Sequence, residues 1–185
     1  MFNIPTYLIE QQVLATAASS VTFDDITAQV AAITAWTPRH LVIRVNGRST
    51  RATTNAHVEI TLNSDTGNNY NSQNIRGAGS STSAARTTAR DYLWRCFIPG
   101  SSVAANAFGG GEGLIPDAFS TRSHKSFIGM AATVEALVEV EAARWADTSA
   151  ITSVTFTADA NEMVAGTTID LAVVDESFNH SEQII

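Results

Sequence analysis

The chain has 185 residues, of which 44% are hydrophobic and 16% are charged, and its formal net charge is −7. This composition is typical of one globular domain rather than a disordered chain, and the negative charge disfavours binding to nucleic acid. The best basic patch, Arg44, Arg48 and Arg51, alternates with polar residues and is also consistent with simple pairing to carboxylates. A single cysteine, Cys96, excludes an intrachain disulfide, and we expect neither a membrane span nor a cleaved signal.

Short alternating segments run through the chain, separated by stretches rich in Gly, Ser, Thr and Asn. Successive side chains of a strand point to opposite faces, so this pattern predicts strands with one face in a core and one in water. In segment 133–145 we expect Val138 and Val140 in the core and the glutamates in water. Those glutamates are Glu135, Glu139 and Glu141. The expected strands are residues 7–10, 20–23, 40–46, 56–63, 71–76, 91–98, 125–132, 133–145, 151–157 and 167–175.

A short helix is expected over residues 25–35, because Ile26, Val30 and Ile33 recur at helical spacing. Asp24 or Asp25 is the expected N-cap, and Pro38 ends the segment. This helix would close one end of the strand bundle.

Two stretches give no strand pattern. Residues 77–88 consist of Gly, Ala, Ser and Thr with Arg86, and two interpretations stay open: a mobile loop, or an arm that becomes ordered against a neighbour. Residues 108–113 are glycine-rich, which predicts a second loop whose backbone bends tightly or approaches another chain closely.

With about eight to ten short strands and no strand–helix alternation, the chain is expected to be all-β. We predict an antiparallel β-sandwich or jelly roll with one short helix near the N-terminus. Residues 1–185 would form a single domain, with residues 1–6 and 176–185 as extended arms.

Several groups of residues carry side chains that could bind a metal ion or act in catalysis. Residues 63–69 offer oxygen ligands, but Asp65 is their one carboxylate, so we favour a turn with Gly67 at positive φ over a calcium site. Glu135, Glu139 and Asp147 would be the carboxylates of a polysaccharide hydrolase, although glutamates two residues apart on an exposed face usually form a solvated surface. We therefore expect no enzyme activity, no metal site and no cofactor.

Aromatic and basic side chains give the remaining candidate contacts. Trp94 is expected in the core, whereas Trp145 is equally consistent with the core and with an exposed ring. The candidate contacts to carbohydrate or to a protein interface are Trp36, Tyr70, Trp145, Arg48 and Arg51.

Several short segments follow one another along the chain: residues 18–23, 40–44 with 48–49, 62–70, 98–102, 105–109, and Trp145 with 148–151. In this order they resemble segments of a widespread group of small bacteriophage virion proteins, and the resemblance spans roughly residues 7–174. In that group a strand ends in a segment like Phe-Asn-Gly-Asp-Thr-Gly-Ser-Asn-Tyr, and here Leu62 and Ser64 replace the usual Phe and Gly.

The resemblance implies a β-sandwich on the outside of a phage particle, assembled in the host cytoplasm. We expect a capsid decoration or cement protein that is a homo-oligomer, with a trimer favoured, and that contacts other virion proteins. The alternative is a tail-fibre, tail-tip or head-spike module that binds host surface carbohydrate through exposed aromatic rings.

Overall fold

The computed structural model describes residues 6–33, 39–134 and 136–174, which form twelve strands and one short helix. The all-β fold class predicted from the sequence is confirmed. The strands are β1 (Thr6–Val13), β2 (Ser20–Phe23), β3 (His40–Gly47), β4 (Asn55–Leu62), β5 (Tyr70–Ala78), β6 (Ser81–Arg90), β7 (Trp94–Pro99), β8 (Gly109–Ile115), β9 (Lys125–Thr133), β10 (Leu137–Trp145), β11 (Val154–Ala158) and β12 (Thr168–Val174).

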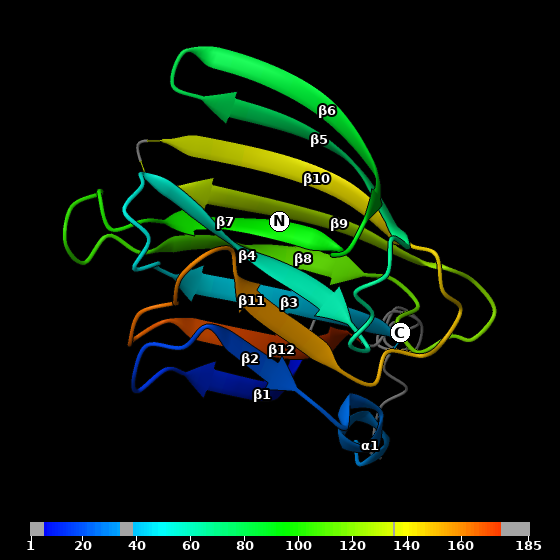
Figure 1. The fold of residues 1–185 in the computed structure, drawn as a ribbon. Coiled ribbons are helices and arrows are strands. Elements are labelled where there is room, and N and C mark those ends of the chain that lie inside the picture. Colours follow the sequence, from blue (N-terminus) through cyan, green and yellow to red (C-terminus); the bar gives the residue numbers. More distant parts are fainter. Residues whose placement is uncertain (1–5, 34–38, 135, 175–185) are drawn as a thin grey trace, which may run out of the picture.

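The strands form two antiparallel sheets that pack face to face (Figure 1). The larger sheet has eight strands in the order β1-β12-β3-β8-β9-β10-β5-β6, and the smaller has four in the order β2-β11-β4-β7. In Figure 1 the smaller sheet lies over only part of the larger one, and the β5–β6 hairpin extends beyond it. The larger sheet therefore has one face turned toward the core and one turned away from it, which we call the open face. At its β3–β12 side this face carries a second, buried cluster of Val42, Ala172 and Val174.

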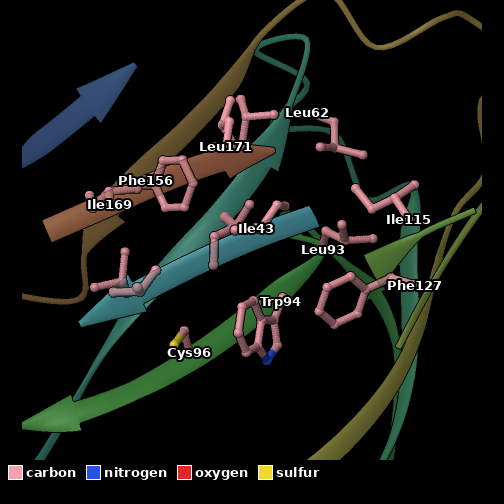
Figure 2. Packing of buried hydrophobic residues seen from close by; sticks show 14 of the residues in the cluster. Ile43, Leu62, Leu93, Trp94, Cys96, Ile115, Phe127, Phe156, Ile169 and Leu171 are labelled. Atoms are coloured by element: carbon pink, nitrogen blue, oxygen red, sulfur yellow. The ribbon is translucent and has the colours of Figure 1, made fainter. Parts of the chain in front are cut away.

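The core lies between the two sheets and is filled by large apolar side chains from both (Figure 2). Trp94 from β7 and Phe127 from β9 are both buried, with ring centroids 5.0 Å apart. The Phe127 ring lies across Gly113 and Gly129, where an added Cβ would come within 2.2 Å and 2.4 Å of it. These two glycines make room for the ring, and the expectation that Trp94 belongs to the core is confirmed.

The short helix α1 (Ile26–Ala31) covers one end of the core, as the spacing of its apolar residues predicted. Ile26 is fully buried, and Val30 and Ile33 pack against the core from its edge. The expected side-chain cap is absent at Asp25, which has left-handed backbone geometry (φ 56°) and makes no capping hydrogen bond. The helix is thus held by apolar burial rather than by its cap.

Both stretches that gave no strand pattern contain strands, which contradicts the loop interpretation of each. Residues 81–90 form β6, the outermost strand of the larger sheet, paired along its length with β5. The glycine-rich segment forms β8, between β3 and β9. A Cβ at Gly110 would lie 2.0 Å from the Val45 carbonyl oxygen, so the glycines serve close approach between strands, not a bend.

Candidate functional site

Strand β10 has its valines and glutamates on the opposite faces from those predicted. Val138 and Val140 are 49% and 45% exposed, whereas Glu139 and Glu141 are 2% and 1% exposed. The prediction was wrong because it assumed that valine must face the core. Here the inward carboxylates are partnered by arginines, and the valines lie on the open face.

Pairing registers define three rows of side chains across β8, β9, β10 and β5 on the open face, perpendicular to the strands. The first row is Gly110, Ala132, Val138 and Gly77. The second row is Glu112, Met130, Val140 and Ile75. The third row is Leu114, Ile128, Ala142 and Gln73. Each row lies two residues along the strands from the next, so neighbouring rows are about 6.6 Å apart.

Five large apolar side chains on three adjacent strands form what we call the apolar patch: Ile75, Ile128, Met130, Val138 and Val140. All five are between 45% and 65% exposed. Single exposed apolar residues are ordinary, but contiguous apolar surface on a sheet face marks an interaction site. The apolar patch is the strongest candidate for a functional surface among the described residues.

A polar region borders the apolar patch on the β8 side. The Arg44 guanidinium forms an ion pair with Glu112 at 2.5 Å, and Gln11 donates a hydrogen bond to Asp170 at 2.8 Å. Between this region and the patch runs a shallow groove of about 570 Å³. Its lining includes Asn46, Gly110, Glu112, Met130, Ala132 and Val138. The groove follows the small residues of the first row.

Behind the valines of β10, buried charges are paired in a compact network. Arg76 binds Glu139 at 2.7 Å and stacks over the Phe97 ring, while Arg90 lies 2.5 Å from Glu141. Burial raises the pKa of Glu139, and the hydrogen bond from Arg76 opposes that shift. Neither glutamate is accessible to a substrate, so the solvated face expected for them is wrong. Glu135 lies outside the described residues.

The candidate contacts Arg48 and Arg51 both make internal contacts. Arg48 donates hydrogen bonds to backbone carbonyls of the loop between β7 and β8, and Arg51 forms an ion pair with Asp159. The carbonyls belong to Ser101, Val103, Ala104 and Ala107. With Arg44 paired to Glu112, the three arginines of the basic patch each have a partner within the chain.

His57 connects two acidic side chains at the outer side of the smaller sheet. Its ring nitrogens lie 3.4 Å from Glu59 and 3.2 Å from Asp159, and Arg95 binds Glu59 at 2.9 Å. The hydrogen bond from His57, together with Arg95, lowers the pKa of Glu59 against the opposing effect of burial. Glu59 also lines a surface pocket of about 320 Å³ together with Tyr92 and Thr155.

Asp65 organises the turn between β4 and β5. Its carboxylate accepts hydrogen bonds from the Gly67 amide at 2.8 Å, the Asn69 side chain at 2.9 Å and the Trp145 indole at 2.7 Å. Burial raises the pKa of Asp65, but the three hydrogen bonds outweigh burial and hold it below its ordinary value. The expected positive φ is not at Gly67 but at Asn63 and Ser64, at 51° and 56°.

Tyr70 and Trp145 are buried, at 0% and 1% exposure, and stack on each other with centroids 6.2 Å apart. The Tyr70 hydroxyl donates to the Asp65 carbonyl at 3.0 Å and accepts from the Leu62 amide at 3.2 Å. The hypothesis that these two rings form an exposed carbohydrate platform is therefore corrected: they anchor the 63–69 turn. Trp36, the third aromatic candidate, lies outside the described residues.

The described ranges hold no group of three or more His, Cys, Asp or Glu side chains placed to bind a metal ion. Among the same residues, no helix combines the length and apolarity needed to cross a bilayer.

Comparisons with known proteins add no family. No protein-family model matches the sequence, and no curated protein matches it significantly. One similar solved structure is the binding domain of botulinum neurotoxin serotype C1, at 9% identity and a TM-score of 0.17. The alignment covers 94% of this chain and 42% of that chain. A likeness this weak carries no argument about function.

The sequence reasoning missed the apolar patch, although β9 held a signal for it. Phe127 and Ala131 point inward, while Ile128 and Met130 point outward, so both faces of this strand carry apolar residues. Strands with apolar residues on both faces are typical of sheets covered on both sides. The apolar residues on both faces of β9 therefore predict that the open face is also covered.

Proposed function

We propose that this chain is a non-enzymatic structural protein on the exterior of a bacteriophage particle, most specifically a decoration or cement protein of the capsid. The resemblance of its short segments, in their order along the chain, to those of small phage virion proteins supports this proposal. So does a β-sandwich whose candidate functional surface is an apolar sheet face rather than a cleft lined by reactive groups.

The exposed apolar patch is the observation that carries the proposal. Full burial of one such side chain contributes about 1.5–3 kcal/mol, so covering five half-exposed ones contributes about 4–7 kcal/mol. Association of two proteins costs an estimated 4–15 kcal/mol in lost freedom, so one such contact alone is weak. Many copies arranged on a symmetric shell convert weak contacts between neighbouring subunits into a stable layer, which suits a decoration protein.

Immunogold labelling of virions from a genome that encodes this chain tests the placement. Antibody raised against the purified protein should label the capsid at many symmetric positions. Labelling confined to the tail tip would overturn the decoration role, and absence of label from intact and disrupted virions would overturn the virion assignment. The resemblance favours a trimer, and mass measurement of the purified protein tests that stoichiometry.

No observation among the described residues supports the alternative function of carbohydrate binding. Two of its three aromatic candidates, Tyr70 and Trp145, are buried, and the two arginine candidates are bound within the chain.

A further inference from the structure

We propose that the apolar patch binds the same patch of a second copy of this chain, around a two-fold axis that follows the second row of the open face. This inference identifies the partner of the apolar patch. It rests on the proposed function only in placing the paired copies on a phage particle. Its physical basis is the match between the first and third rows.

A two-fold axis along the second row places the first row of one copy opposite the third row of the other. On β8 this sets Gly110 against Leu114 of the second copy, and on β9 it sets Ala132 against Ile128. In both pairs one residue is small where the other is large. The face is thus sterically complementary to itself.

The same relation continues on the next two strands. On β10 the large residue, Val138, lies in the first row and meets Ala142. On β5 the large residue, Gln73, lies in the third row and meets Gly77. Four strands in succession therefore pair large with small. A different protein would have to supply this matching surface independently, whereas a second copy supplies it by symmetry.

The groove on the open face agrees with this arrangement. Its floor and walls include Gly110, Ala132 and Val138 of the first row, and its volume is about 570 Å³. Ile128 of the second copy would fill it, beside Leu114, which is half-buried against Val42, Ala172 and Val174 of its own chain. In the second row, Met130, Val140 and Ile75 would each face their own counterpart near the axis. Glu112, paired with Arg44, would face its counterpart at the β8 end of that row.

The area fits a weak, concentration-dependent dimer. The five strands β8, β9, β10, β5 and β6, spaced by about 4.8 Å, and a length of seven residues at about 3.3 Å give a footprint of roughly 550 Å². A standard stable interface buries about 800 Å² on each partner. We therefore expect a reversible dimer, or an assembly built from dimers, in place of the trimer favoured on the resemblance.

Sedimentation equilibrium of the purified chain over a range of concentrations tests the pairing. The expected result is a reversible monomer–dimer equilibrium that Val140→Asp shifts at least tenfold toward monomer, because two carboxylates would meet among apolar side chains without the counter-ion that Arg44 gives Glu112. Val13→Asp is the matched control, since Val13 is 56% exposed on the same face but belongs to β1, outside the footprint. A monomer at every concentration, or a trimer insensitive to Val140→Asp, would overturn the proposal.

A size swap tests the register without a new charge. Ile128→Ala and Ala132→Ile should each weaken the dimer, and the double variant should restore it, because the large residue has only exchanged rows. A variant with Val140→Cys should also be cross-linked to its own copy by a short bismaleimide, whereas Val13→Cys should not. Circular dichroism of each variant identifies any loss of folding, and cross-linking of folded Val140→Cys does not depend on the aspartate variant.

Failures of the two proposals are distinguishable. A monomeric protein that labels capsids would remove the self-pairing and leave the virion role. A dimer with the expected swap behaviour that is absent from virions would remove the virion role and leave the pairing.

Discussion

Replacing Asp65 by Asn tests whether one turn carboxylate holds the end of the sandwich together. The oxygen that accepts the Trp145 indole N–H at 2.7 Å also accepts the Asn69 amide at 2.9 Å. An amide can keep the hydrogen bond from the Gly67 N–H through its remaining oxygen. Its NH₂ group, however, cannot accept from the indole, so Trp145 is left with a buried donor that has no acceptor.

The magnitude follows from that single loss. A hydrogen bond to a charged group contributes about 1.5–3 kcal/mol, and leaving a buried donor unsatisfied costs about 1–3 kcal/mol. Both figures estimate the loss of the same hydrogen bond, so they are not added together. We expect Asp65→Asn to lower the free energy of unfolding by about 2–3 kcal/mol at neutral pH. The hydrogen bonds hold the pKa of Asp65 below its ordinary value of 3.8. The difference between wild type and variant should therefore persist above pH 3.8 and vanish as the pH falls through the lower folded pKa.

Urea unfolding followed by far-ultraviolet circular dichroism measures the effect, and Trp145→Phe supplies the other arm of a double-mutant cycle. Removing the indole N–H should make Asp65→Asn less costly by about 1–2 kcal/mol. An Asp65→Asn cost below about 0.5 kcal/mol, or an equal cost in both backgrounds, would refute the assigned hydrogen bond.

Three other predictions concern the core and its charges. Gly113→Ala should destabilise by about 1–3 kcal/mol or more in thermal unfolding, because its Cβ would lie 2.2 Å from the Phe127 ring, whereas Gly77→Ala, with its nearest neighbour at 3.4 Å, should cost much less; equal costs would contradict the packing. Cys96 is fully buried and its pKa is raised, so an aromatic disulfide reagent should react with it only at the rate of unfolding, and fast reaction of the native protein would refute this. Glu59 has a lowered pKa, so its contribution to the free energy of unfolding is present above pH 4.5 and is lost as the pH falls through the lower folded pKa. Glu59→Gln should flatten that part of the curve of melting temperature against pH. An unchanged curve would contradict the assigned interactions of Glu59.

The sequence pattern was sufficient for most strands because their alternation is decided by one buried face. In β4, Val58, Ile60 and Leu62 are buried and the residues between them are only partly exposed, as the period of two predicted. Residues 81–90 gave no such pattern because β6 is exposed on both sides until Arg90, and its pairing to β5 comes from backbone hydrogen bonds. Hydrophobic alternation carries no information about a strand of that kind.

The candidate surface was less predictable because its meaning depends on tertiary partners. Nothing local indicates that Glu139 lies inward, since its partner Arg76 comes from another strand of the sheet. Tyr70 was a candidate contact and Trp145 was equally consistent with the core and with an exposed ring, yet the polar atoms of both are satisfied inside the fold. Hydrophobic alternation along a strand shows that its two faces differ, but it does not show which face packs against the second sheet.

The inward glutamates of β10 also bear on how the chain folds. Sliding this strand by one position would exchange its two faces and bury Val138 and Val140, a competing register that simple hydrophobicity rewards. In that state Glu139 and Glu141 would lose Arg76 and Arg90, and those arginines would be left without counter-ions. The two ion pairs therefore favour the native register of β10. A chain that lacks both arginines should populate the register shifted by one residue during refolding.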